Sequence, residues 1–195
     1  MPDALLDADH AATPLTPDER DGLIPNYITL RSELNEAEQL GVLAADAWAF
    51  ARRRPVLDEK FLRNLHKRMF GAVWRWAGHY RRSDRNLGVE AYRIPANMAL
   101  LLDEARYWTG HDTYPPDEIA ARLHHRLVLI HCYPNGNGRH ARLAADLLLA
   151  RLGLPRFSWG IANLTAPGEA RRTYIGALRA ADGQDYAPLL AFVRS

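Results

Sequence analysis

The chain has 195 residues, of which 48% are hydrophobic and 25% are charged, and these values exclude a disordered or membrane-embedded composition. Lys and Arg number 25 against 23 Asp and Glu, so the formal net charge of +2 gives no argument for nucleic-acid binding. A single cysteine, Cys132, excludes an internal disulfide and a cysteine-rich zinc site.

The N-terminal stretch is rich in Asp, Ala and Pro over residues 1–22. It has neither the basic start nor the apolar run of a secretory signal. No apolar run elsewhere approaches the roughly 18 residues that a transmembrane helix needs. The sequence therefore predicts a loose arm over residues 1–28, no membrane span and a cytoplasmic location.

Helical periodicity of the apolar residues dominates the rest of the chain. Helices are predicted at residues 32–53, 58–74, 96–109, 116–131, 137–152, 166–181 and 185–193. The period disappears between Gly78 and Pro95, where Asn, Gly and short β-prone pieces are typical of a hairpin. The predicted fold class is all-α with one hairpin.

A loop rich in Gly and Asn, "PNGNG", interrupts two of these helices after His131. Two arginines, Arg139 and Arg142, share one face of the following helix, where cations are unfavourable unless an anion lies beside them. Glycines let a backbone approach an anion, and the N–H groups at a helix start point toward it. A neutral His131 at this loop could accept a proton from a hydroxyl. These residues favour a phosphate cradle beside a base.

A simpler interpretation of the loop is a turn between two helices. In that case Arg142 pairs with Asp146 four residues on, and His131 caps the preceding helix. Glycine-rich loops are weak evidence on their own, so the residues by themselves leave both interpretations open.

The stretch "HCYPNGNGRHAR", His131–Arg142, resembles the signature of the Fic/Doc family, H-x-F-x-D/E-G-N-G-R-x-x-R. "WRWAGHYR" and "YRIPANM" are also similar to the family, and the resemblance covers roughly residues 55–185. The start "GLIPNYITLRSELNEAEQ" is most similar to the group called mobile mystery protein B. The resemblance implies a Fic fold, which is a helical bundle with one β-hairpin flap. It places an N-terminal helix at 29–54 and a Fic domain at 55–195.

Fic proteins typically transfer AMP from ATP to a hydroxyl of a target protein, so the resemblance implies ATP as substrate and Mg²⁺ as metal ion. It implies that His131 is the catalytic base. The implied nucleotide-binding residues are Asn135, Gly136, Asn137, Gly138, Arg139 and Arg142. The flap at residues 80–95 is implied to align the backbone beside a target Ser, Thr or Tyr by strand addition.

Asn135 departs from the family pattern, which has Asp or Glu at this position to coordinate Mg²⁺. A neutral amide oxygen is a weaker ligand for a hard cation than a carboxylate. The departure leaves open the transfer of another nucleotidyl or phosphate-bearing group. It also leaves open a nucleotide-binding regulatory module of a toxin–antitoxin-like pair.

Two further patterns, Thr29-x-x-x-Glu33 and Ser32-x-x-x-Glu36, resemble the inhibitory motif of many family members, whose glutamate pairs with the second signature arginine. Either glutamate could instead stabilise the start of a helix. An antitoxin-like partner protein is the alternative source of restraint.

Three further positions complete the sequence-based predictions. Tyr133 replaces the usual Phe that anchors the loop, and its hydroxyl needs a partner or an opening to water. Cys132 is expected to be a small buried residue. His66, like the other scattered histidines, is interpreted as a surface or capping residue.

Overall fold

The computed structural model describes residues 17–161, 164 and 168–195, and in this part of the chain all regular elements are helices. The helices are α1 (Pro17–Arg20), α2 (Arg31–Phe50), α3 (Glu59–Phe70), η1 (Ala91–Arg93), α4 (Ile94–His111), α5 (Pro116–Ile130), α6 (Asn137–Arg151), η2 (Trp159–Ile161), α7 (Glu169–Asp182) and α8 (Ala187–Val193). The all-α prediction is confirmed for this part of the chain. Most of the predicted arm lies outside the described residues, and the proposed domain boundaries stay a prediction. No described helix combines the length and the apolar character that crossing a membrane requires.

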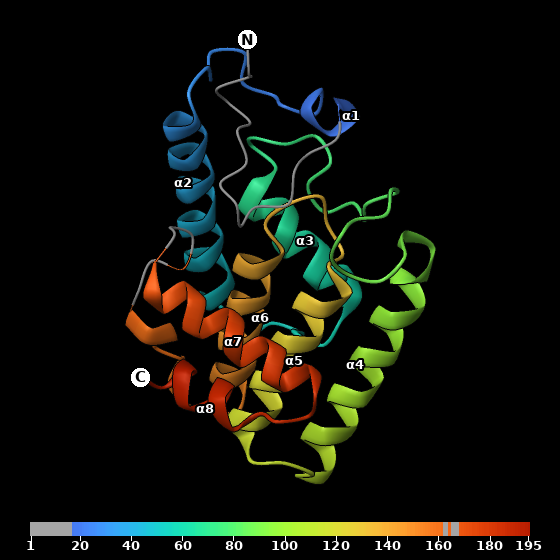
Figure 1. Cartoon of the computed structure of the whole chain (residues 1–195), viewed down its shortest axis with the longest axis vertical. Coiled ribbons are helices and arrows are strands. Elements are labelled where there is room, and N and C mark those ends of the chain that lie inside the picture. The colour runs from blue at the N-terminus through green and yellow to red at the C-terminus, as the bar shows by residue number, and fades with distance from the viewer. Residues whose placement is uncertain (1–16, 162–163, 165–167) are drawn as a thin grey trace.

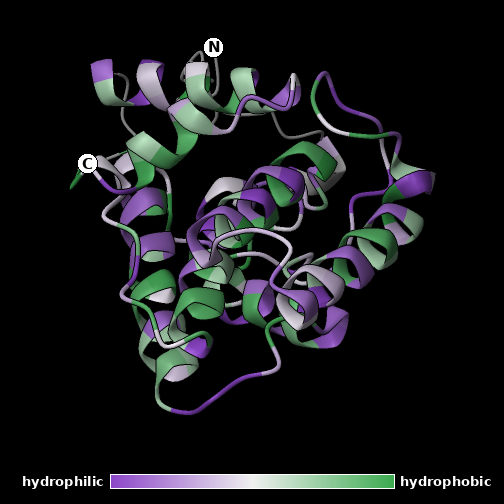
Figure 2. Cartoon of the chain, turned by 90° about the horizontal axis from the view of Figure 1, so that it is seen from below, coloured by the Kyte–Doolittle hydropathy of each residue, from purple (hydrophilic) through white to green (hydrophobic). Residues whose placement is uncertain are grey.

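Helices α5 and α6 form the centre of the molecule and pack against each other along their length (Figure 1). Helix α4 covers α5 on one side, α3 lies against α6, and α2 packs on α3. Helices α7 and α8 pack against each other, α8 contacts α5, and α7 crosses in front of α5 and α6 (Figure 1). The outer helices alternate hydrophilic and hydrophobic residues along the ribbon, as amphipathic helices do (Figure 2). The loop between α5 and α6 therefore connects the two central helices.

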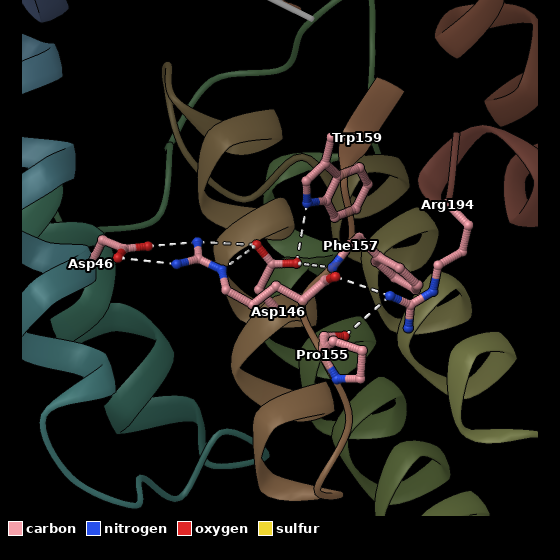
Figure 3. A network of polar contacts seen from close by, with 7 residues as sticks. Asp46, Asp146, Pro155, Phe157, Trp159 and Arg194 are labelled. Carbon is pink, nitrogen blue, oxygen red and sulfur yellow. Dashed lines mark hydrogen bonds and ion pairs between the residues drawn. The ribbon is translucent and has the colours of Figure 1, made fainter. Parts of the chain in front are cut away.

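A network of polar contacts fastens α2 and the segment before α7 to α6 (Figure 3). The buried Asp146 accepts hydrogen bonds from the backbone N–H of Phe157 at 3.2 Å and from Nε1 of Trp159 at 3.1 Å. Arg156 bridges Asp146, at 3.2 Å, and Asp46 of α2, at 2.6 Å. Asp146 therefore pairs with Arg156. The simple-turn interpretation had predicted a pair between Asp146 and Arg142.

The predicted β-hairpin flap at residues 80–95 is wrong, because no strand forms in this segment and α4 begins inside it. The segment 79–90, called the flap loop below, is irregular. Its backbone N–H groups at Arg81 and Val89 donate to the carbonyls of Cys132, at 2.9 Å, and Ile130, at 3.4 Å. These groups bond the end of α5 instead of each other, and an isolated two-stranded hairpin has little stability of its own in water.

Candidate functional site

The loop from His131 to Gly136, called the signature loop below, is held by left-handed backbone conformations at both ends. His131 ends α5 with φ 54°, and Gly136 precedes α6 with φ 79°. The side chain of Asn137 closes the loop, since its Oδ1 accepts from the Tyr133 N–H at 2.9 Å and its Nδ2 donates to the Tyr133 carbonyl at 2.7 Å. Asn137, predicted as a nucleotide contact, therefore shapes the loop in this structure.

The signature loop rests on aromatic side chains of α3. The Gly136 backbone lies directly on the Phe70 ring, so that an added Cβ would come within 2.5 Å of that ring. Glycine is required here for this contact as well as for its positive φ. Gly136 and Gly138 thus leave the first turn of α6 uncovered by side chains of their own. Backbone N–H groups of a first helical turn lack intrahelical partners, which is the arrangement that binds anions.

His66 of α3 supports the loop from below and is fully buried. Its Nδ1 accepts from the Gly78 N–H at 3.0 Å, and its Nε2 lies 3.1 Å from the Asn135 carbonyl. Because Nδ1 accepts, the single proton of a neutral imidazole is on Nε2 and is donated to Asn135. Burial holds the pKa of His66 well below its usual value, which keeps the ring neutral. The ring also stacks on Tyr133 with centroids 3.6 Å apart. The interpretation of His66 as a surface or capping residue was wrong.

Arg139 lies in the first turns of α6, where its guanidinium contacts Glu38 of α2 at 2.6 Å and lies over the Phe70 ring at 4.7 Å. The other oxygen of Glu38 accepts from Nε1 of Trp74 at 2.6 Å. Glu38 is only 3% exposed, so this ion pair is largely shielded from water. The carboxylate of Glu38 is therefore bound to Arg139, the arginine for which the sequence predicts a phosphate partner.

The two glutamates predicted to be regulatory lie elsewhere on α2. Glu33 accepts hydrogen bonds from the backbone N–H groups of Thr29 at 2.8 Å and Leu30 at 3.0 Å, which stabilises the helix start and lowers its pKa. Glu36 is exposed to solvent. The residue that sequence reasoning missed, Glu38, lies on the buried face of the same helix. Only the docking of α2 on α3 and α6 identifies it.

Arg142 lies one turn after Arg139, and its burial lowers its pKa. It hydrogen-bonds the side chain of Tyr174 on α7. The structure thus brings the two signature arginines together beside the first turn of α6 but gives them different partners. Arg139 contacts a carboxylate, whereas Arg142 contacts a phenol.

His131 is half-buried at the end of α5, and one ring nitrogen hydrogen-bonds the backbone of Val128. Burial, together with the nearby charges of Arg81 and Arg85, lowers its pKa to about 4. The imidazole is therefore neutral at ordinary pH, which is the form that accepts a proton. His131 is also the C-cap residue of α5 that the simpler interpretation predicted, and its role as a base stays a prediction.

The flap loop is attached to His131 through Arg81, which is 3% exposed. Its Nε donates to the His131 carbonyl at 2.7 Å, Nη1 donates to the Ser83 carbonyl at 2.9 Å, and Nη2 donates to the Val89 carbonyl. At Gly88, with φ 92°, an added Cβ would come within 2.5 Å of the His131 Cβ. The flap loop therefore packs directly on the candidate base. Nothing in the sequence distinguished Arg81 from the exposed Arg82 beside it.

Asn135 is a poor site for a metal ion in this arrangement. Its Oδ1 is neutral and already accepts from the Gly136 N–H at 2.6 Å. The described residues contain no group of three His, Cys, Asp or Glu side chains that could hold a metal ion. The donor set therefore lacks the carboxylate that Mg²⁺ favours.

Comparison with known proteins places this geometry in a family. The Fic/DOC family model matches residues 56–149. The protein adenylyltransferase Fic of Drosophila melanogaster is 31% identical over 138 residues, covering 69% of this chain and 27% of the relative, and that of Drosophila yakuba is 31% identical with 26% of the relative covered. The chain thus spans about a quarter of the length of these curated relatives.

Solved structures share the fold. Fic-1 from C. elegans aligns with a TM-score of 0.67 and 25% identity over 89% of this chain and 51% of that chain. The BepC protein of Bartonella tribocorum, solved with bound AMPPNP, aligns with a TM-score of 0.68 and 16% identity over 92% of this chain and 97% of that chain. The narrower resemblance to the mobile mystery protein B group stays a prediction. With its signature loop, its helical arrangement and its matched residues in agreement, the chain belongs to the Fic/DOC family.

Proposed function

We propose that the protein transfers AMP from ATP to a hydroxyl side chain of a target protein. The observation that carries this proposal is the position of a neutral His131 between the flap loop and the signature loop, which leads into the first turns of α6 with Arg139 and Arg142. The name of the Drosophila relatives, protein adenylyltransferase, supports the same activity. The first turn of α6 would bind the phosphates through backbone N–H groups.

In the proposed step, His131 accepts the proton of the target hydroxyl. The hydroxyl oxygen forms a bond to the α-phosphorus of ATP, and the bond from that phosphorus to the bridging oxygen of the β-phosphate breaks. Pyrophosphate leaves with the electron pair of that bond, and AMP remains on the target. Positioned bases of this kind contribute roughly 10²–10⁴-fold to a rate. Phosphate charge near His131 favours the imidazolium and would raise its low pKa toward working pH.

Magnesium, which the resemblance implies, would have the amide oxygen of Asn135 as its protein ligand. This oxygen is weaker than a carboxylate and is already bonded to Gly136, so the step above is written without a metal ion. The variant Asn135→Asp supplies the missing carboxylate. We expect it to increase Mg²⁺-dependent labelling of a target, and unchanged labelling would contradict this account of Asn135.

The same neutral residue favours a second candidate, the transfer of another nucleotidyl or phosphate-bearing group. A panel of α-labelled ATP, GTP, CTP and UTP, together with γ-labelled ATP, separates the two candidates. Label from α-labelled ATP alone supports AMP transfer, whereas label from γ-labelled ATP identifies phosphoryl transfer.

For regulation, we propose Glu38 in place of Glu33 and Glu36. Its carboxylate pairs with Arg139 and would compete with a nucleotide phosphate for that guanidinium. In Glu38→Gln the competing charge is removed and the side chain keeps nearly the same volume, so labelling should rise. The exposed Glu36→Gln on the same helix is the matched control. Equal labelling in all three proteins would favour restraint by an antitoxin-like partner or no restraint.

The target would dock at residues 80–95 beside His131. The flap loop exposes Leu87, which is 56% exposed, and Tyr92, which follows it, is 76% exposed. Leu87→Ser should lower the labelling of a protein target while leaving ATP binding unchanged. A parallel loss of ATP binding would contradict a docking role.

A further inference from the structure

Two buried polar side chains, Tyr174 and His124, form a hydrogen-bonded series that ends at Arg142. The hydroxyl of Tyr174 on α7 lies 2.8 Å from Nε2 of His124 on α5, and the same hydroxyl hydrogen-bonds Arg142 on α6. His124 is 0% exposed and Tyr174 is 7% exposed. Three helices that are separated in sequence therefore meet at one phenol.

We propose that Tyr174 and His124 are positioning residues that hold Arg142 for the terminal phosphate of a nucleoside triphosphate. This inference rests on the proposed function, because it assigns Arg142 to the substrate's phosphates. Neither side chain belongs to the signature.

The chemistry of the three groups decides which group donates and which accepts in each hydrogen bond. A guanidinium can only donate, so the Tyr174 oxygen accepts from Arg142. His124 is neutral, because burial lowers its pKa to about 3, and a neutral imidazole carries one proton. Nδ1 has no hydrogen-bond partner among the described residues, so the tautomer follows from the other nitrogen. Because the Tyr174 oxygen accepts from Arg142, the hydroxyl hydrogen of Tyr174 is left for Nε2 at 2.8 Å, and the imidazole proton is assigned to Nδ1. Nε2 then accepts the Tyr174 O–H, which leaves a lone pair of Tyr174 facing Arg142.

Neighbouring aromatic rings restrict the movement of His124 and Tyr174. The His124 ring lies 4.7 Å from the Trp159 ring, and the Tyr174 ring lies 5.6 Å from that of Phe192. A phenol whose proton is committed to His124 cannot turn its O–H toward Arg142. The acceptor of Arg142 is therefore fixed in place before any phosphate arrives.

The contrast with Arg139 explains why a phenol suits this position. Glu38 neutralises the charge of Arg139 and must be displaced by a phosphate. Tyr174 orients Arg142 without cancelling its charge, since burial raises the pKa of the phenol and keeps it neutral. Arg142 therefore keeps its full positive charge for an anionic ligand.

Calorimetric titration with ATP and with ADP tests this inference. In Tyr174→Phe, ATP binding should weaken about tenfold because one hydrogen bond to a charged group is lost, while ADP binding changes little. In an Arg142→Ala background the same change should have no further effect on ATP binding. Tyr186→Phe is the matched control, because Tyr186 is another buried tyrosine bonded to a histidine, His125, at 3.0 Å.

A second measurement examines the protonation of His124 in the protein without nucleotide. In ¹⁵N-histidine spectra, His124 should carry its proton on Nδ1 and should not titrate between about pH 5 and 8. A proton on Nε2, equal losses for ATP and ADP in Tyr174→Phe, or an undiminished effect in the Arg142→Ala background would each overturn the inference. A parent protein that shows the expected binding pattern but transfers no AMP contradicts only the proposed function. A parent that binds neither nucleotide overturns both.

Discussion

Two irregular segments meet at His131, and they are held in opposite ways. Side chains of regular helices reach into the signature loop, since His66 of α3 and Asn137 of α6 bond its backbone. The flap loop is held by its own Arg81, which bonds two carbonyls of that loop and the carbonyl of His131. Side chains of other elements therefore hold the signature loop, whereas a side chain of the flap loop itself supplies three of the bonds that hold the flap loop.

Because of this difference, the signature loop should affect the stability of the whole protein, whereas the flap loop should affect access to His131. The signature loop lies within the core, so a change that breaks it should lower the stability of the whole protein. The flap loop takes three of its hydrogen bonds from one arginine and exposes many of its other side chains, so a change there should open it locally. The candidate base is therefore rigid on one side and covered by a separable segment on the other.

The largest expected effect comes from removing the support of the signature loop. His66→Ala leaves the Gly78 N–H and the Asn135 carbonyl unpaired in the core and removes the ring that stacks on Tyr133. We expect a loss of roughly 4 kcal/mol in the free energy of unfolding. Urea denaturation measures this loss, and a decrease below about 1 kcal/mol would show that the loop does not depend on His66.

Acid should destabilise the same region. His66, His124 and His140 are fully buried, and their pKa values are lowered, to about 3 for His124 and about 4 for His140. Because the unfolded chain binds protons near pH 6.5 and the folded state does not, stability is complete above about pH 6.5 and is lost as pH falls.

Each of these histidines contributes roughly 1 kcal/mol to the loss between pH 6 and pH 5, or about 3 kcal/mol in all. Urea denaturation at the two pH values measures it. His140→Gln, which keeps a side chain able to donate to the Leu62 carbonyl, should reduce the loss by about one third. Equal stability at pH 6 and pH 5 would contradict buried neutral histidines.

The histidines also show what the sequence could and could not predict. His66 follows Leu62 by four residues and precedes Phe70 by four, so helical spacing alone could have placed it on the buried face of α3. Glu38 was beyond such reasoning. The inhibitory pattern led to Glu33 and Glu36, and only the packing of α2 on the helices that follow selects a third glutamate.

Helix positions were predictable because apolar periodicity records burial directly, and α5 and α6 were placed within a residue or two of the structure. The roles proposed for His131 and the two arginines come from the resemblance of the signature, and they stay predictions. The flap loop was not predictable, because its backbone bonds the end of α5 and depends on Arg81 rather than on strand propensity.

A change in the flap loop tests its independence from the core. Arg81→Lys keeps the charge but cannot bond three carbonyls in the geometry of a guanidinium. We expect a loss of about 2 kcal/mol or less in global stability and much faster hydrogen exchange of the Val89 amide. Arg82→Lys, at the exposed neighbour, is the control. Unchanged exchange at Val89 in Arg81→Lys would contradict the role of Arg81.

The smallest effect is expected at Tyr133, whose hydroxyl is buried and has no hydrogen-bond partner among the described residues. Tyr133→Phe removes an unsatisfied polar group and keeps the stacking on His66. We expect stability to be unchanged or to rise by up to about 1 kcal/mol. Thermal unfolding of the two proteins measures this, and a clear loss would indicate that the hydroxyl has a partner, such as a buried water.

In the proposed reaction, His131 accepts the proton of a target hydroxyl as AMP is transferred. The most direct test of this step is the rate of labelling of target proteins from α-labelled ATP by Glu38→Gln and by Glu38→Gln/His131→Ala. We expect the second variant to label at least a hundredfold more slowly while binding ATP equally well. Equal rates in the two variants would contradict this role of His131.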